Sequence, residues 1–167
     1  MVNGAKCSGS MSYHQSNNNI AMQTPSDAVR IVEVGPRDGL QNIQKPIPTQ
    51  TKLELIRRLT HTGLRTVELT SVVSPKTIPQ LADCRQVLQD TDVKRLLDRP
   101  NLRLPVLVPN LKGLEIAIQQ GVREIAVFIS ATEGFSRANI NCTVDEGIKR
   151  AKQVASKAVG AGVTVRG

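Results

Sequence analysis

The sequence predicts an α/β protein made of parallel βαβ units, arranged as a TIM (β/α)8 barrel of which this chain holds the N-terminal part, about four and a half units. Three observations predict this fold. Between Val29 and Gly167, short runs of β-branched residues alternate with amphipathic helical stretches. The loop after the first run, residues 35–41, has only two glycines with a charged pair between them, which is a poor phosphate loop for the competing doubly wound sheet. The chain also ends at a fifth expected strand, whereas a barrel closes with eight.

Composition excludes several classes of protein. Of the 167 residues, 40% are hydrophobic and 22% are charged, which is enough apolar material for the core of one domain. No apolar run approaches the roughly 20 residues of a membrane-spanning helix. Aromatic residues make up only 2% of the chain, so a stacking platform for nucleic acid is not expected. Three scattered cysteines form neither a disulfide framework nor a zinc box, which favours a reducing compartment.

The net charge of +8 is spread along the chain without a basic cluster. We expect most of it to lie on solvated helix faces. Its functional meaning would be attraction to a small anionic substrate, with neither nucleic acid nor membrane as a partner. Residues 1–28 are polar, rich in Ser and Asn, and contain Lys6 as their one Lys or Arg. They are expected to form a disordered tail without a secretory or mitochondrial address.

Five runs are expected as strands because they are short, β-branched and bounded by turn residues. They are residues 30–34, 66–70, 104–108, 124–129 and 163–165. Residues 79–97 are expected to form a broken helix that carries several charges.

Three further helices have a start signal. Thr51 with Glu54, and Thr143 with Glu146, have the spacing of a capping box, in which the two side chains satisfy each other's backbone donors. Asn110 is expected to cap a helix that follows the third strand.

A set of candidate site residues follows or ends the first four expected strands. It comprises Arg37, Asp38, Glu68, Ser71, Ser74, Lys76, Pro109, Asn110, Ser130, Glu133, Arg137 and Asn139. Because the carboxyl ends of parallel strands meet at one edge, we expect these residues to converge. Carboxylate and other oxygen ligands suit Mg²⁺. Composition alone supports a second interpretation equally well, in which Arg37 and Asp38 form a surface turn and Glu68 pairs with a lysine.

Several of these segments together resemble the 3-hydroxy-3-methylglutaryl-CoA lyases. The matching segments are residues 32–42, 67–71, 73–76, 105–113 and 139–142. The Arg-Asp-Gly-x-Gln pattern is shared more widely, with isopropylmalate and homocitrate synthases. The Gly-Pro before it, the Ser-Pro-Lys and the Asn-Ile-Asn-Cys indicate the lyase branch. The resemblance runs through residues 29–167 and implies the N-terminal part of a barrel of the pyruvate-carboxyltransferase and lyase group.

The resemblance implies metal-dependent cleavage of 3-hydroxy-3-methylglutaryl-CoA to acetoacetate and acetyl-CoA, a step in leucine catabolism and ketone-body formation. Asp38 would bind the divalent ion, Mg²⁺ or Mn²⁺. Arg37 would be catalytic by stabilising charge on the thioester oxygen, and Glu68 by orienting Arg37 or a metal-bound water. A purely structural role of Glu68, as the partner of Arg37, stays open. The implied substrate-binding residues are Arg37, Gln41, Ser71 and Asn139. Lys112 and Arg137 could meet the phosphates of coenzyme A.

The sequence departs from the family pattern at the other metal ligands. The family supplies a His-x-His pair and an asparagine from late strands, and a mobile cysteine loop, and none of these is matched here. His14 lies in the tail and His61 near the end of a helix, so neither is expected to bind metal. The chain is therefore expected to hold half a metal site and to be inactive by itself.

Two other functions stay open from the sequence. One is an acyl-transferring synthase of the same barrel group, and the other is a non-catalytic half barrel. The resemblance favours the mitochondrial matrix as the compartment, with the cytoplasm or the peroxisome as alternatives, and leaves a homo-oligomer open.

Overall fold

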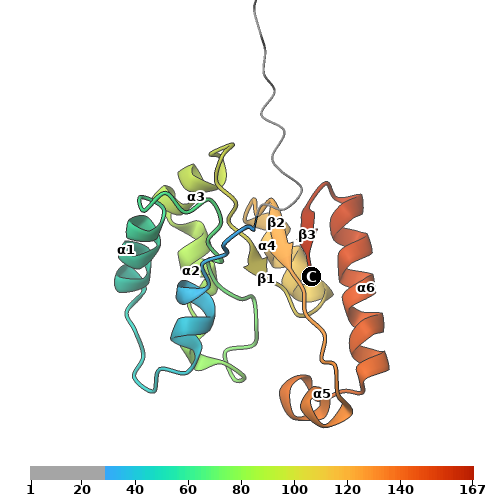
Figure 1. Ribbon diagram of the computed structural model, residues 1–167. Coiled ribbons are helices and arrows are strands. Elements are labelled where there is room, and N and C mark those ends of the chain that lie inside the picture. The colour runs from blue at the N-terminus through green and yellow to red at the C-terminus, as the bar shows by residue number, and fades with distance from the viewer. Residues whose placement is uncertain (1–28) are drawn as a thin grey trace, which may run out of the picture. The chain divides into compact units, whose positions relative to one another are not determined.

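The computed structural model describes residues 29–167 (Figure 1). The prediction of a disordered tail concerns residues 1–28, which lie outside this range. The chain divides into two units, Met1–Arg30 and Ile31–Gly167, and the second unit contains the fold and the candidate site.

A parallel sheet lies at the centre of this unit. Its regular strands are β1 (Val106–Leu107), β2 (Glu124–Ala126) and β3 (Thr164–Arg166), in the order β1-β2-β3. The register places Ile125 of β2 between Val106 of β1 and Val165 of β3. The prediction of an α/β protein with a parallel sheet is confirmed.

Two more extended segments join the sheet through isolated parallel bridges. Glu33 pairs with Val67, and the segment 66–71 pairs in turn with the segment 103–107. The order of the five segments follows the sequence and does not reverse among them, as it would in a doubly wound sheet. The pairing between the second and third segments is interrupted because Pro105 lies in its middle and has no N–H to donate. The barrel itself stays a prediction.

Two of the predicted helix starts are confirmed. Helix α6 (Val144–Gly160) has the full capping box, because Thr143 accepts from the amide of Glu146 and the Glu146 carboxylate accepts from the amide of Thr143. Helix α4 (Leu111–Gln119) begins at Asn110, whose side chain accepts from the amide of Gly113 at 2.9 Å. The predicted broken helix divides into the 3-10 turn η2 (Pro79–Leu81), α2 (Cys84–Gln89) and α3 (Thr91–Leu97).

The capping box predicted at Thr51 is wrong. Helix α1 (Thr49–Leu59) begins two residues earlier, after Pro48, so Thr51 lies within its first turn. Glu54 does not reach back to the start of the helix, because Arg57 and Arg58 bind its carboxylate. These hydrogen bonds lower the pKa of Glu54 from 4.5 to about 2.

Two helical elements, η1 and α5, were not predicted from the sequence. The loop after the first extended segment is a π-helical turn, η1 (Gly35–Gly39). The loop after β2 contains helix α5 (Glu133–Ile140), which starts where the Thr132 hydroxyl accepts from the backbone and stops at Asn141, whose φ of 49° is left-handed. Helix α5 has few apolar residues, so the sequence shows no clear amphipathic period that would predict it.

The two faces of the sheet differ in chemistry because successive residues of a strand point to opposite sides. One face packs against α1, α2, α3, α4 and α6 and forms the hydrophobic core. Its members include Val67, Leu69, Val106, Ile125 and Val163 from the extended segments, with Ile56, Leu88, Leu114, Val154 and Ala158 from the helices. The alternate residues include the charged Glu68, Glu124 and Arg166, and Glu68 and Arg166 belong to the candidate site.

Candidate functional site

A chain of charged side chains lies on the second face of the sheet. Glu68, in the second extended segment, is fully buried. Its Oε1 accepts from Nε of Arg37 at 2.5 Å, and its Oε2 accepts from Nη2 of Arg166 in β3. One carboxylate thus bridges two guanidinium groups that come from segments 129 positions apart, residue 37 and residue 166. Both oxygens of this buried carboxylate are therefore hydrogen-bonded to guanidinium groups, as the burial of a polar group requires.

The η1 turn sets the direction of Arg37 and Asp38. The carbonyl oxygen of Val34 accepts from the amides of Arg37, Asp38 and Gly39, at 3.1, 2.7 and 3.3 Å. This tight turn places Nη1 of Arg37 at 2.7 Å from Oδ1 of Asp38, whose side chain is 55% exposed. The interpretation of Arg37 and Asp38 as a plain surface turn is therefore wrong, because Arg37 reaches into the molecule and binds Glu68.

A second ion pair, half-buried, lies toward the amino ends of the strands. Arg103 binds the buried carboxylate of Glu124 through two nitrogens, with Nε at 2.7 Å from Oε2. This hydrogen bonding raises the pKa of Arg103. The pair lies on the same face of the sheet as Glu68, and neither of its residues lines the cavity at the carboxyl ends of the strands.

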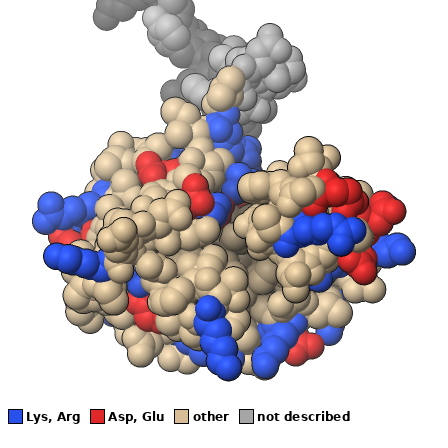
Figure 2. All heavy atoms as spheres, turned by 90° about the horizontal axis from the view of Figure 1, so that it is seen from below, with Lys and Arg blue, Asp and Glu red and all other residues tan. Residues whose placement is uncertain are grey.

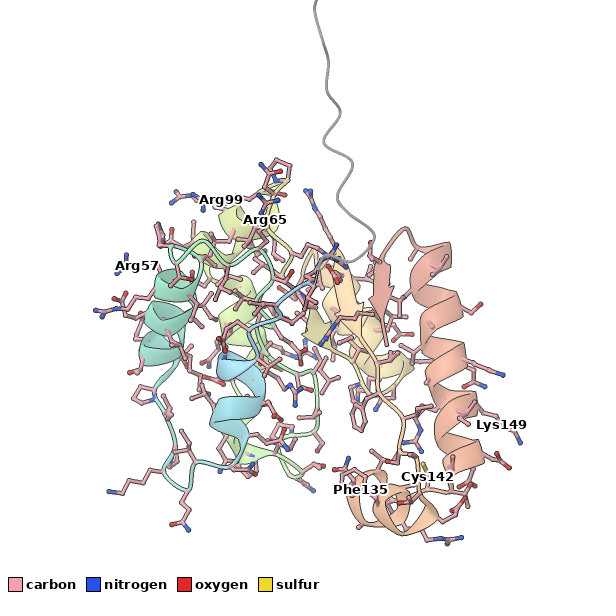
Figure 3. All side chains as sticks on the ribbon, viewed as in Figure 1. Arg57, Arg65, Arg99, Phe135, Cys142 and Lys149 are labelled. Atoms are coloured by element: carbon pink, nitrogen blue, oxygen red, sulfur yellow. The ribbon has the colours of Figure 1, made fainter. Side chains whose placement is uncertain are left out.

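The carboxyl ends of the strands border a cavity of about 690 Å³. Its polar lining comprises Arg37, Asp38, Gln41, Glu68, Ser74, Thr77, Asn110, Asn139, Asn141, Arg150 and Arg166. Phe128, Phe135 and Ile140 give it an apolar side. Figure 2 looks onto this end of the molecule and shows it hollowed between its two sides. Figure 3 places Phe135 on α5 and Cys142 close to it, at the junction with α6.

Of the wider set of candidates at the strand ends, Ser74, Pro109 and Asn110 line the cavity, whereas Lys76, Ser130 and Glu133 do not. Of the six residues that the resemblance implies for the site, the structure brings five together and leaves one out. Arg37, Asp38, Gln41, Glu68 and Asn139 all line the cavity. Ser71 does not, because it is fully buried and its hydroxyl donates to the backbone oxygen of Leu107 at 3.2 Å.

The two cations suggested for coenzyme phosphates are also absent from the lining. Arg137 faces Glu133 at 3.7 Å on the surface of α5, and Lys112 lies on the exposed side of α4. Of the three cysteines, Cys84 and Cys142 are described and buried, and burial raises the pKa of the Cys84 thiol, which argues against a nucleophile.

Sequence reasoning missed Arg166 and Arg150. Arg166 was within reach of the sequence, because period two along the last strand puts it on the same face as Thr164, opposite the apolar Val165. Its Nε is buried and has no hydrogen-bond partner among residues 29–167. Arg150 gave no signal, since it lies on the polar side of α6 and only the packing of α6 beside α5 brings it to the cavity.

A comparison with known protein families finds a match over most of this chain. The model of the family described as HMGL-like matches residues 28–167. The chain belongs to the HMGL-like family.

Individual relatives of this HMGL-like chain are much longer than it is. It is 53% identical over 139 residues to the mitochondrial hydroxymethylglutaryl-CoA lyase of Arabidopsis thaliana, and the match covers 83% of this chain and 29% of that protein. It is 50% identical to the cytoplasmic 3-hydroxy-3-methylglutaryl-CoA lyase of Danio rerio, with 83% and 40% covered. The chain thus spans less than half the length of these relatives.

Solved structures of lyases resemble this HMGL-like chain in fold as well. The hydroxymethylglutaryl-CoA lyase of Pseudomonas aeruginosa matches with a TM-score of 0.75 at 44% identity, over 83% of this chain and 45% of that one. A lyase from Acinetobacter baumannii, solved with coenzyme A and 3-methylmalate, matches with a TM-score of 0.74 at 30% identity, over 86% and 45%.

HMGL-like enzymes generally depend on a divalent metal, and the described residues fit only part of such a site. Among residues 29–167 no group of three or more His, Cys, Asp or Glu side chains could hold an ion. Of the two acidic residues that line the cavity, Glu68 has both oxygens bonded to arginines. Asp38 uses only Oδ1 within the described residues, so its other oxygen is open to a cation.

No helix in this part of the chain is long and apolar enough to cross a membrane.

Proposed function

We propose that this chain carries the arginine and carboxylate part of the active site of a 3-hydroxy-3-methylglutaryl-CoA lyase, built on a TIM (β/α)8 barrel. The observation that carries the proposal is the buried Glu68, which holds Arg37 at the floor of a cavity beside Asp38. The names of the similar proteins in Arabidopsis, Danio and Pseudomonas support the substrate.

The reaction is a retro-Claisen cleavage. A base removes the proton of the tertiary hydroxyl of the substrate, and that oxygen becomes the ketone of acetoacetate as the bond between carbons 2 and 3 breaks. The electron pair of this bond moves into the thioester, which forms an enolate. Protonation of carbon 2 then gives acetyl-CoA. The step that most needs the protein is the accumulation of negative charge on the thioester oxygen.

Arg37 is placed to stabilise that charge. Its Nε is held by Glu68 and its Nη1 by Asp38, while Nη2 has no partner among the described residues. Because Glu68 is buried and bound from the other side by Arg166, the guanidinium is fixed before substrate arrives. A preorganised donor pays no reorganisation cost during the reaction, which is why such a donor lowers the barrier.

A divalent cation, Mg²⁺ or Mn²⁺, belongs to this proposal with Asp38 as one ligand. When bound, the cation would lower the pKa of the substrate hydroxyl and orient the substrate carboxylate. The polar lining near Asp38 includes the amides of Gln41 and Asn139, which we propose as substrate contacts.

The test is a chimera in which residues 29–167 replace the matching part of the Pseudomonas aeruginosa lyase. We expect Mg²⁺-dependent release of acetoacetate from 3-hydroxy-3-methylglutaryl-CoA. Asp38→Asn should weaken the affinity for the divalent ion, so that half-maximal activity needs more metal, and excess Mg²⁺ or Mn²⁺ should partly restore the rate. A matched control is Asp145→Asn, which changes an acidic residue in the first turn of α6.

Two results would contradict the proposal. One is a folded chimera that releases no acetoacetate, and the other is a metal affinity, measured by titration, that Asp38→Asn leaves unchanged. Condensation of acetyl-CoA with a 2-oxo acid, measured in the same samples, would instead indicate an acyl-transferring synthase.

A further inference from the structure

Lys52 in α1 is the only buried lysine among residues 29–167, and neither of its hydrogen-bond partners, Gln80 and Asp83, is a site residue. Its side chain is 6% exposed. Burying an ammonium group costs several kcal/mol of hydration, and an apolar residue would fill the same volume without that cost. The position of Lys52 therefore calls for an explanation other than packing.

The ammonium group of Lys52 binds the part of the chain that follows the second extended segment, residues 66–71. Its Nζ donates to the backbone oxygen of Gln80, in η2, at 2.5 Å and to Oδ1 of Asp83 at 2.6 Å. The other carboxylate oxygen of Asp83 accepts from the Thr49 hydroxyl at 2.8 Å. Both oxygens of Asp83 thus bind side chains of α1. The bond from Lys52 to the backbone of Gln80 holds η2 against the same helix.

The same cluster reaches the loop that follows Arg37 and Asp38. Nε2 of Gln80 donates to the backbone oxygen of Ile43 at 2.8 Å. Ile43 in turn donates its amide to Leu40, directly after η1, and α1 packs against η1. A continuous path of hydrogen bonds therefore joins Lys52 to the turn that directs Arg37.

Both loops that this cluster binds, the one that contains η1 and the one before η2, line the cavity. The first contributes Arg37, Asp38 and Gln41, and the loop before η2 contributes Ser74, Thr77 and Ile78. Neither Lys52 nor Asp83 lines it. The ion pair lies behind the site, where it can set loop positions without meeting a ligand.

We propose that Lys52 and Asp83 are positioning residues, which hold the two loops so that Arg37 stays in register with Glu68. The relevance of this geometry to catalysis rests on the proposed function, whereas the geometry itself is independent of it.

The test uses nuclear magnetic resonance on the full 167-residue chain. The Nε–H signal of Arg37, assigned by its loss in Arg37→Lys, reports the bond to Glu68. In Lys52→Met we expect this signal to shift toward its free position. The amides of Asp38 and Ile78 should exchange about tenfold faster with solvent, as expected for the loss of one hydrogen bond to a charged group.

Matched variants separate positioning from general stability. Lys157→Met removes an exposed ion pair to Glu115 and should move neither the Arg37 signal nor these amides. In Lys52→Met the amide of Val127, bonded to the backbone of Arg166 in the sheet, should keep its exchange rate. Gln80→Ala, which cuts only the bond to Ile43 and leaves the buried pair in place, should accelerate exchange at Asp38 but not at Ile78.

An unchanged Arg37 signal in Lys52→Met would overturn the proposal. So would faster exchange spread evenly over the chain, since that describes loss of stability. Should Lys52→Met fail to fold, an unchanged Asp38 amide in Gln80→Ala would overturn it as well. None of these measurements needs turnover, so a failed lyase assay leaves this inference standing, and its own failure leaves the lyase proposal intact.

Discussion

At the scale of single residues, the site depends on a buried carboxylate between two cations. Glu68→Gln keeps the volume but replaces the carboxylate that bridges Arg37 and Arg166 with a neutral amide, so that Arg37 keeps only its ion pair with the exposed Asp38. Removing one partner of a buried pair costs about 3 kcal/mol. We expect a loss of this size in the free energy of unfolding, measured with urea at neutral pH.

A matched control for this prediction is Glu115→Gln, which breaks an exposed ion pair with Lys157. Exposed pairs contribute less than about 1 kcal/mol. Equal losses in the two variants would mean that the contacts of Glu68 are no stronger than those of a surface residue.

Arg37 supports a kinetic prediction in the active chimera. Arg37→Lys replaces a planar fork, whose Nε and Nη1 are committed to Glu68 and Asp38, by a single ammonium that cannot make these bonds and still face a ligand. We expect kcat to fall far more than KM rises, because the lost interaction belongs to the transition state. Steady-state kinetics with 3-hydroxy-3-methylglutaryl-CoA measures this, and a change in KM alone would make Arg37 a binding residue.

At the scale of elements, the capping box of α6 supports a prediction about pH. Hydrogen bonds from the amide and hydroxyl of Thr143 lower the pKa of Glu146 below 4.5 in the folded chain. A carboxyl group with a lowered folded pKa stabilises the fold above its unfolded pKa, and this contribution is lost as the pH falls through the folded value. The wild-type chain should therefore lose the contribution of Glu146 below about pH 4.5.

The variant that tests this is Glu146→Gln, which keeps an acceptor for the cap but removes the titration. Melting temperatures measured from pH 7 to pH 3 should converge for wild type and variant at the acid end. Thr143→Ala should cost about 1 kcal/mol at pH 7, because it removes the other half of the box. A gap between wild type and Glu146→Gln that is constant with pH would contradict the assignment.

At the scale of the whole molecule, we expect no turnover from the 167-residue chain by itself. Among the residues described, Asp38 is the only carboxylate at the cavity with an oxygen open to a cation, and one such ligand holds a hydrated ion weakly. An acetoacetate assay with Mg²⁺ checks this, with Asp38→Ala as the background. Turnover above that background would mean that the site is built differently from the one proposed.

The sequence alone determined the features that depend on neighbours along the chain. Alternation of apolar and polar runs predicted the parallel α/β fold, and Asn110, Thr143 and Glu146 marked helix starts, because capping involves residues three positions apart. Short motifs also located Arg37, Asp38, Gln41, Glu68 and Asn139, which share one cavity.

Only the tertiary structure decided which charges meet. Arg166 is 98 residues from Glu68, and the pairing of β3 with β2 brings it onto the same face of the sheet. Lys52 had the pattern of an ordinary helix residue, yet the packing of α1 against α2 buries it beside Asp83. Ser71 followed a strand like the residues that line the cavity, but its hydroxyl donates to a backbone carbonyl. Sequence patterns could not predict which of these charged side chains form buried ion pairs, because the energy of an ion pair depends on burial and on distance in space.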